Sequence, residues 1–358
     1  MNLFQELINV AICNRASLSK IPSRSEWENL YWLAEKHSLI GICFTAIERL
    51  PQEQWPYSEL LINWYGVTCI IRKRNEELNN QCVQLYNSLT KGGYRNCILK
   101  GQGIAKKYPS TLSANRSSGD IDIWLEGGIA KALDLAKSFN YCPRVTKHHI
   151  DLPFFENTEV EVHFIPATLF NPITNKRLKE WFASCSDTEF RQNPINGFVS
   201  SSDSFNFVYL PLHIFHHLFD EGVGLRQIMD YYFFMIDNKL SDTQKEKSYK
   251  FLCRLGMKSF IGGLMWVLGE YFAMHKRFMF CPPNAKHGSF LLQEILLSGN
   301  MGRYDLRLNN AKKNTRWNRF MFMNKYNLRL FRYYSLETIW APISRIEVWA
   351  WRKVKGWI

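Results

Sequence analysis

The sequence predicts an α+β protein in which a small mixed β-sheet lies between helical regions on its N-terminal and C-terminal sides. Apolar residues recur at helical spacing through about the first 90 residues and again after Pro172. Between these regions, short segments alternate polar and apolar residues, which is typical of strands. With 358 residues and 46% hydrophobic content, the chain can bury a sizeable core and is not a disordered protein.

Residues 1–93 are predicted to form an N-terminal helical region. Ser23 and Glu26 have the spacing of a capping box, so a helix is expected to begin directly after Ser23. A longer helix is expected over about 57–89, and the two glycines at 92–93 end it.

Residues 94–170 are predicted to form the core that contains the sheet. Short segments here combine β-branched or aromatic residues with alternating polarity, and Gly, Pro, Asn or Ser residues separate them. Two helices are expected between the strands. The expected strands are 96–99, 117–125, 144–155 and 158–165, and the expected helices are 100–108 and 128–139.

Residues 171–300 are predicted to form a helical domain, with helices at about 205–219 and 225–236. Residues 301–358 are predicted to be a basic, aromatic and helical C-terminal segment. Thirteen Lys or Arg residues stand there against three acidic ones, a net charge of +10 in a chain whose total is +13.

Three interpretations of this C-terminal segment stay open. The favoured one is a solvated helical surface, in which aromatic side chains pack inward and arginines face water. The other two are contact with an anionic membrane surface and contact with nucleic acid.

The nine cysteines are scattered and none belongs to a C-x-x-C pair, so free thiols and a reducing, cytoplasmic location are expected. No apolar run is long enough to span a bilayer, and the first residues lack the basic start and cleavage site of a signal peptide.

Asp120 and Asp122 are the strongest candidates for a functional site. Their spacing of two in a strand puts both carboxylates on one face, while Ile121 and Ile123 point into a core. Adjacent carboxylates repel each other unless a cation lies between them, and their hard oxygen atoms suit Mg²⁺ or Mn²⁺. The Ser and Gly residues at 117–119 can approach phosphates closely. The pattern favours metal-assisted phosphoryl or nucleotidyl transfer.

A second acidic strand strengthens this hypothesis. Glu159, Glu161 and His163 share one face of the strand expected over 158–165, and the residues between them share the other. As a neighbour of the first strand, it would add a third carboxylate and complete a two-metal site. Glu161 is preferred as that ligand and Glu159 is the alternative, while His163 is either hydrogen-bonding support or an active participant.

Four elements of the core resemble a known family. They are Leu99-Lys100-Gly101, Tyr108-Pro109, Arg116 with Gly119-Asp120-Ile121-Asp122, and Glu161-Val162-His163. Together they look like the DNA polymerase-β-like nucleotidyltransferase superfamily, and most of all like its uncharacterised bacterial nucleotidyltransferase family. The resemblance covers about residues 95–235. It implies Mg²⁺ or Mn²⁺ as cofactor and an NTP, such as ATP, as substrate.

The resemblance also implies roles for the matching residues. Asp120, Asp122 and Glu161 would be the catalytic metal ligands, and Glu161 could also help to activate an acceptor hydroxyl. The residues expected to bind the nucleotide are Lys100, Gly101, Arg116, Ser117, Ser118 and Gly119. Asp120 follows Gly101 by nineteen positions, a longer spacing than the superfamily usually shows, so 117–119 is a second candidate for the phosphate-binding loop.

Two helical groups have alternative interpretations. Arg226 and Asp230 are spaced i,i+4, so a salt bridge is the simplest expectation and a contact from Arg226 to the nucleotide is the alternative. His213, His216 and His217 gather on one helix face. Packing and hydrogen bonding between helices is favoured for them, with a transition-metal site as the alternative.

The expected function is a metal-dependent nucleotidyltransferase that moves NMP from an NTP to a hydroxyl or phosphate acceptor, which the sequence does not identify. The alternative is a catalytically silent nucleotide- or polyanion-binding protein on the same fold. Retention of Asp120, Asp122 and Glu161 favours the enzyme, because a silent protein need not keep clustered charges that destabilise its fold.

Overall fold

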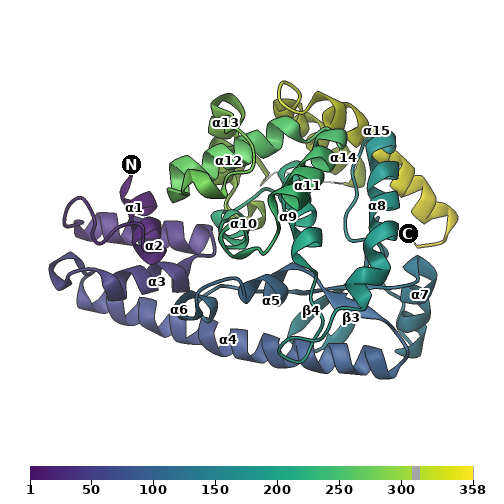
Figure 1. Cartoon of the computed structure of the whole chain (residues 1–358), viewed down its shortest axis with the longest axis horizontal. Helices are drawn as coiled ribbons and strands as arrows, with labels where there is room; N and C mark the ends of the chain where they lie inside the picture. Colours follow the sequence, from purple (N-terminus) through teal and green to yellow (C-terminus); the bar gives the residue numbers. More distant parts are fainter. Residues whose placement is uncertain (309–314, 358) are drawn as a thin grey trace.

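The computed structural model describes residues 1–308 and 315–357, and it confirms the predicted α+β class (Figure 1). One four-stranded sheet lies among helices that precede, interrupt and follow it. The strands are β1 (Asn96–Ile98), β2 (Ile121–Leu125), β3 (His149–Phe155) and β4 (Thr158–His163). The helices are α1 (Leu3–Ala11), α2 (Arg24–Lys36), α3 (Ile40–Arg49), α4 (Ser58–Lys91), α5 (Lys100–Ala105), α6 (Ser110–Ser113), α7 (Gly128–Ser138), α8 (Pro172–Phe190), α9 (Asp203–Asp220), α10 (Leu225–Asp237), α11 (Asp242–Arg254), α12 (Lys258–Phe272), α13 (Ala285–Ser298), α14 (Arg316–Asn327) and α15 (Ser335–Val354).

The N-terminal helices follow their sequence signals. The hydroxyl of Ser23 accepts a hydrogen bond from the backbone N–H of Glu26, and the Glu26 carboxylate accepts one from the N–H of Ser23, so the capping box is confirmed. The long helix α4 lies within two residues of its expected bounds at each end, and Gly92 follows it.

The sheet has the strand order β1-β2-β4-β3 and is mixed, as predicted. β2 is antiparallel to β1 but parallel to β4, and β3 is antiparallel to β4. The parallel pair aligns Asp122 with Glu161, and the next pair aligns Glu161 with Asp151. Three acidic residues therefore lie side by side across three strands, on one face of the sheet.

The other face of the sheet is apolar and packs on α4 and α7. Ile121 and Ile123 of β2 and Val160 and Val162 of β4 are buried there, against leucines of both helices. Figure 1 shows α4 running along this side of the sheet. Because side chains alternate along a strand, this packing turns the acidic residues to the opposite face, as the sequence predicts.

Aromatic side chains hold α8 and α9 over part of the acidic face. Trp124 of β2 packs on Phe182, Phe190 and Phe205, with ring centroids 6.1, 4.7 and 5.4 Å away. α9 therefore lies over the face that carries the carboxylates.

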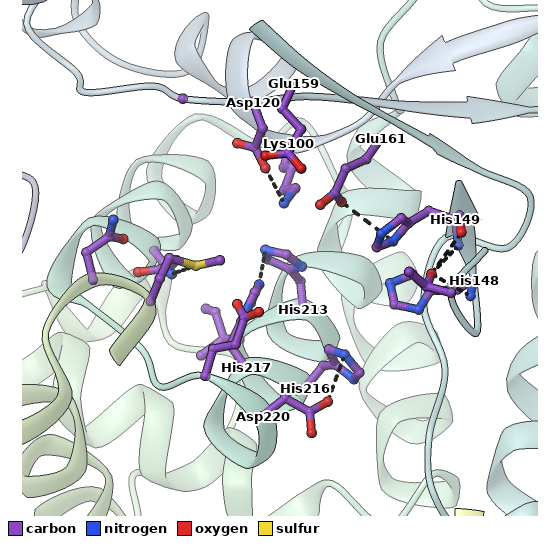
Figure 2. Close-up of a pocket in the computed structure, with 18 of the residues that line it drawn as sticks. Lys100, Asp120, His148, His149, Glu159, Glu161, His213, His216, His217 and Asp220 are labelled. Carbon is purple, nitrogen blue, oxygen red and sulfur yellow. Dashed lines mark hydrogen bonds and ion pairs between the residues drawn. The ribbon is translucent and has the colours of Figure 1, made fainter. Parts of the chain in front are cut away.

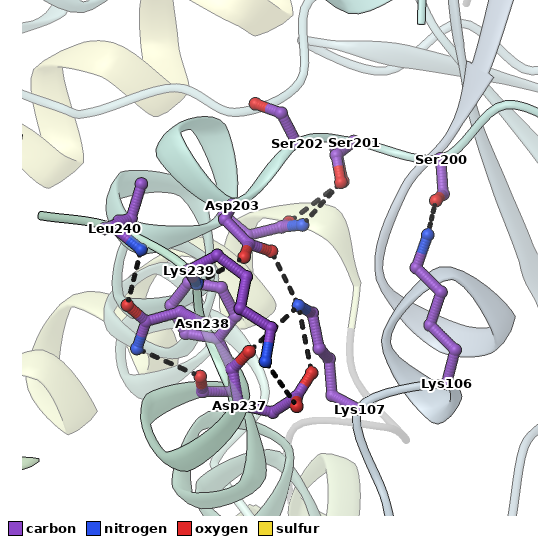
Figure 3. A network of polar contacts seen from close by, with 12 residues as sticks. Lys106, Lys107, Ser200, Ser201, Ser202, Asp203, Asp237, Asn238, Lys239 and Leu240 are labelled. Carbon is purple, nitrogen blue, oxygen red and sulfur yellow. Dashed lines mark hydrogen bonds and ion pairs between the residues drawn. The ribbon is translucent and has the colours of Figure 1, made fainter. Parts of the chain in front are cut away.

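A polar network fixes the start of α9 to the end of α5 (Figure 3). The Lys107 ammonium lies 2.8 Å from Asp203 in the first turn of α9 and 3.2 Å from Asp237 at the end of α10. Lys106 donates a hydrogen bond to the hydroxyl of Ser200, just before α9. One pair of lysines thus joins three helices beside the sheet.

The strand expected over 144–155 is shorter than predicted, because β3 begins at His149. The Thr146 hydroxyl accepts hydrogen bonds from the N–H groups of His148 and His149, and the Thr146 N–H donates to the His149 carbonyl. These local bonds make a tight turn that competes with the strand ladder. The turn leaves one bridge, between Val145 and Ile150, and brings His148 to the acidic face.

The two hydrophobic clusters do not follow the chain in simple order. Helices α1–α3 share one cluster with α9, α10, α12 and α13, whereas the apolar face of the sheet, α7 and the second half of α4 form the other. The division into regions at residues 93, 170 and 300 stays a prediction. All nine cysteines are free thiols, as expected.

The described part of the C-terminal segment is helical, and residues 309–314 of it lie outside the described residues. The prediction that its aromatics pack inward and its arginines face water is wrong at several positions. Trp317 and Trp349 are 66% and 49% exposed, whereas Arg329 and Arg345 reach inward to Glu294 and Asp220. Carboxylates removed from water need cationic partners, and these arginines supply them. None of the described helices combines the length and apolarity that a bilayer crossing requires.

The packing of Trp124 is predicted to be a main source of stability. Trp124→Ala should reduce the free energy of unfolding by about 3–5 kcal/mol, because it leaves a cavity among three phenylalanines. The matched control is Trp317→Ala, which should cost less than about 1 kcal/mol since that ring is mostly exposed. Urea unfolding followed by circular dichroism measures both, and equal losses would contradict the packing described here.

Candidate active site

A cavity of about 820 Å³ lies between the acidic face of the sheet and helices α9 and α10. Figure 2 shows Lys100, Asp120 and Glu161 on the sheet side of it and His213 and His217 on the α9 side. The residues predicted for the site that line the cavity are Lys100, Gly101, Arg116, Ser117, Ser118, Gly119, Asp120, Glu159, Glu161, Arg226, His213, His216 and His217. Asp122 and His163 lie buried directly behind this lining.

Asp122 and Glu161 are neighbours because β2 and β4 pair in parallel register. Asp122 is only 2% exposed, and Asp120 lies on the same face one strand period before it. Three carboxylates therefore gather at one edge of the cavity. Like charges at this range raise each other's energy, so the cluster depends on nearby cations.

Lys100 supplies the first of these cations. Its ammonium lies 3.0 Å from Oδ2 of Asp122 and 3.6 Å from Oδ2 of Asp120. Burial alone would lower the pKa of Lys100, but Asp120, Asp122 and Glu161 outweigh it and raise this pKa well above its ordinary value. In return, Lys100 lowers the pKa of Asp120. The pair is therefore charged on both sides at neutral pH.

His163 supplies the second cation. Its Nε2 lies 2.9 Å from Oδ1 of Asp122 and 3.3 Å from Oε2 of Glu161. Burial lowers the pKa of His163, but hydrogen bonds to these two carboxylates outweigh burial and raise it to about 9. The pKa of Glu161 is lowered, because His163, His149 and Lys100 together outweigh the effect of its burial. His163 thus has the supporting contact that was one of its two expected roles.

Backbone conformation brings Lys100 to the carboxylates. β1 ends at Ile98, and the N–H of Leu99 donates to the carbonyl of Asp122 at 2.9 Å, which ties the chain to β2. Lys100 and Gly101 then both have positive φ angles, +26° and +46°. Glycine adopts this conformation at little cost, which explains its place in the motif. α5 begins here, as expected.

The loop 117–119 is held in place by two arginines. Arg226 of α10 donates to the carbonyl of Ser117 at 2.8 Å, and Arg116 donates to the hydroxyl of Ser118. The Nε of Arg226 is buried and has no hydrogen-bond partner among the described residues, while the residue lines the cavity. This leaves Arg226 a donor for a ligand.

The helical spacing predicts a salt bridge between Asp230 and Arg226, but Asp230 pairs with Arg116 instead. Nε and Nη2 of Arg116 each lie 2.7 Å from an oxygen of Asp230, and the hydroxyl of Tyr108 donates to the same carboxylate at 2.6 Å. Arg116 comes from the loop before β2, a partner that helical spacing within α10 cannot predict. Its bidentate contact leaves Arg116 as an anchor of the loop beside the cavity.

Three groups of side chains have the spacing to hold a metal ion among the described residues. They are Asp122 with Glu161 and His163, His149 with Asp151 and Glu161, and His148 with His149 and His163. Glu161 takes part in two of these groups and Asp122 in one, whereas neither Asp120 nor Glu159 takes part in any of them. The arrangement favours Glu161 over Glu159 as the third acidic ligand, which stays a prediction.

His148, His149 and Asp151 are site residues that the sequence did not reveal. His149 and Asp151 alternate along β3 and so share the face of Glu161, with His149 Nδ1 3.7 Å from Glu161 Oε2. Their alternation was a usable signal, but only the pairing of β3 with β4 shows that this face borders the cavity.

The polar contacts of the three histidines of α9 lie within that helix and its C-terminal end, whereas hydrogen bonding between helices was favoured for them. His217 and His213 hydrogen-bond through their Nε2 atoms at 3.0 Å, and His216 lies 3.3 Å from Asp220. Within the described part of the chain, none of the three belongs to a group that could hold a metal ion.

Comparison with known proteins identifies a family. The family described as uncharacterised nucleotidyltransferase matches residues 23–273, well over half of the chain, so this protein belongs to it. The match confirms the predicted nucleotidyltransferase family, while the wider superfamily and the bacterial origin stay predictions. No curated protein and no solved structure matches the chain.

The two glutamates of β4 should differ in metal binding. Glu161→Gln is predicted to weaken Mn²⁺ binding by about tenfold or more, because it removes a charged ligand beside Asp122. Glu159→Gln is the matched control and should change the affinity less than about twofold, since Glu159 is exposed and water and salt screen its charge. Titration calorimetry measures both, and the reverse ranking would assign the third ligand to Glu159.

Raising the pH should destabilise the metal-free protein. The pKa of His163 is about 9 in the folded state against an ordinary 6.5, so its contribution is complete below pH 6.5 and disappears as the pH rises through 9. Urea unfolding in the presence of a chelator should show a loss of at most about 3.5 kcal/mol across this window, because one pKa unit corresponds to about 1.4 kcal/mol. His163→Gln should remove most of this dependence. A flat wild-type profile would mean that His163 is neutral in the folded protein.

Proposed function

We propose that this protein is a metal-dependent nucleotidyltransferase that moves NMP from an NTP to a hydroxyl or phosphate acceptor. The observation that carries the proposal is the register of β2 and β4, which sets Asp122 beside Glu161 with Asp120 one strand period away. Family membership supports the same class of reaction. In the proposed reaction an acceptor oxygen attacks the α-phosphorus of the NTP. The bond between the α-phosphorus and the oxygen that bridges to the β-phosphate breaks, and pyrophosphate is released.

The donor set fits a hard divalent cation. Asp120 and Glu161 line one edge of the cavity and Asp122 lies buried directly behind it, and carboxylate oxygens of this kind suit Mg²⁺ or Mn²⁺. Lys100 already contacts Oδ2 of both aspartates, so metal binding and these ion pairs compete for the same atoms. Bound metal would neutralise charge on the triphosphate and orient it for in-line attack.

The chain's own residues would bind and orient the two substrates. The loop 117–119 is held by Arg116 and Arg226 and lines the cavity, so its backbone N–H groups would be the donors to phosphate oxygens. Arg226 would add a charged donor through its unpartnered Nε. The volume of about 820 Å³ lies within the range of small-molecule sites, so it can receive a nucleotide and part of an acceptor.

Glu161 is the residue proposed to bind the hydroxyl of the acceptor substrate. Its lowered pKa keeps it ionised, and it borders the cavity, so it can accept a hydrogen bond from an approaching hydroxyl. His163 holds Glu161 from behind at 3.3 Å and fixes its orientation. His163 is therefore a positioning residue, since it lies buried behind the lining.

The alternative is a silent binding protein of the same family. One observation favours it: Lys100 pairs with both aspartates and reduces their need for a metal. The two candidates differ in a single measurable property, because only the enzyme converts the NTP to pyrophosphate and a labelled acceptor.

The aspartate variants provide the test. Asp120→Asn and Asp122→Asn should each reduce transfer of label from NTP to components of a cell extract by about 100-fold or more, because each removes charge that stabilises the transition state. The matched control Asp134→Asn changes an exposed aspartate of α7 and should keep full activity. Label incorporation and pyrophosphate release with Mg²⁺ or Mn²⁺ measure the effect. Wild-type activity in both site variants would refute the proposed site, and NTP binding without turnover in the wild type would favour the silent alternative.

A further inference from the structure

Helix α15 faces solvent with its apolar side. The side chains turned inward include Glu337, Thr338 and Ser344, all nearly buried. The side chains turned outward at helical spacing form what we call the outer stripe: Leu336, Ile339, Ile343, Ile346, Ala350 and Val354. This is the reverse of the usual amphipathic arrangement, in which the apolar stripe packs on the core.

Specific polar contacts fix this orientation. The Glu337 carboxylate accepts hydrogen bonds from the backbone N–H groups of Phe170 and Asn171 at 2.6 and 3.3 Å. The Ser344 hydroxyl accepts from the Lys147 ammonium at 2.7 Å, and Arg345 lies 2.9 Å from Asp220. Rotating the helix to bury its isoleucines would leave these groups without partners inside the protein, at a high cost. The exposed stripe is therefore a stable feature of the fold.

A groove between α14 and α15 extends this apolar surface. It has a volume of about 940 Å³ and is lined by Trp317, Phe320, Met323, Ile346 and Trp349, with arginines at 144, 319, 345 and 352. Ile346 belongs to both the groove and the outer stripe. Four lining residues, Arg144, Asp220, Glu221 and Arg345, also line the catalytic cavity. A ligand in the groove would thus border the active site.

The charge around this apolar surface selects among possible partners. Three exposed cations lie beside it, Arg319, Lys353 and Lys355. The C-terminal segment carries a net charge of +10. One acidic residue, Glu347, is exposed among the residues of the outer stripe. A second copy of the same surface would bring like charges together. Nucleic acid would match the cations but not a row of aliphatic side chains. An anionic bilayer matches both, because apolar side chains enter its acyl boundary while basic ones contact its headgroups.

We propose that α14 and α15 form a binding site for anionic phospholipid at a membrane surface. The outer stripe inserts between headgroups, Trp349 lies at the interface, and Lys353 and Lys355 contact headgroup phosphates. The groove receives the apolar part of one lipid, with Arg319 beside its phosphate. The site does not depend on the proposed transfer reaction, and its test uses no activity.

The test is co-sedimentation of the full chain with vesicles. Vesicles of phosphatidylcholine with about one third phosphatidylglycerol should bind the protein at least about tenfold more strongly than pure phosphatidylcholine, and added salt should weaken this binding. Ile339→Ser with Ile343→Ser should reduce the binding about tenfold or more, and so should Lys353→Glu with Lys355→Glu. The matched control is Ile62→Ser with Ile70→Ser, which changes two exposed isoleucines of α4 and should bind like the wild type. Circular dichroism checks that every variant is folded.

Three results would overturn the proposal. The first is wild-type binding to anionic vesicles no stronger than to phosphatidylcholine. The second is a lipid-free dimer in light scattering that the Ile339→Ser, Ile343→Ser variant converts to a monomer, which would assign the stripe to a second copy. The third is equal loss of vesicle binding in the α4 control, which would show that any exposed isoleucine pair contributes.

Discussion

The parallel pairing of β2 with β4 is the constraint on which the site depends. It sets Asp122 beside Glu161, and the strand period adds Asp120 on the same face. Such a cluster is costly unless cations accompany it, and the two strands that pair with β2 provide them. His163 ends β4 two residues after Glu161, and Lys100 follows β1, whose partner is β2. A register shift of one residue would turn Glu161 into the apolar core and expose Val160 or Val162.

Packing on both faces of the sheet stabilises this register of β2 and β4. Leucines of α4 and α7 bury the apolar face of the sheet, and Trp124 with the phenylalanines of α8 and α9 covers part of the other. The lysines directly after α5 contact the start of α9 and the end of α10. They therefore join these two helices, which border the cavity, to the sheet side of it. The arginines at 116 and 226 hold the loop between them. These contacts tie the helices and the loop that border the cavity to one another.

Much of this could be read from local patterns. Period-two alternation predicted which residues of β2 and β4 face the core, because a strand offers only two faces. The capping box at Ser23 and the long helix that became α4 depend on short-range chemistry and were also predictable. β3 was predicted too long, because the Thr146 hydroxyl captures backbone donors that the alternating pattern had assigned to a ladder. His149 and Asp151 were missed for a related reason, since alternation says nothing about which strand lies alongside.

The sequence by itself determined the element types, the face of each strand and the identity of the acidic residues, since these depend on neighbours a few positions apart. Only the tertiary structure decided how the charges are paired. Asp230 pairs with Arg116 instead of Arg226. Lys100 pairs with both Asp120 and Asp122. It also decided that α15 turns its isoleucines outward, because Glu337 and Ser344 meet partners from residues 170–171 and 147. Buried charges pair with whichever groups the packed helices bring next to them, and the spacing of residues along the sequence does not predict these pairs.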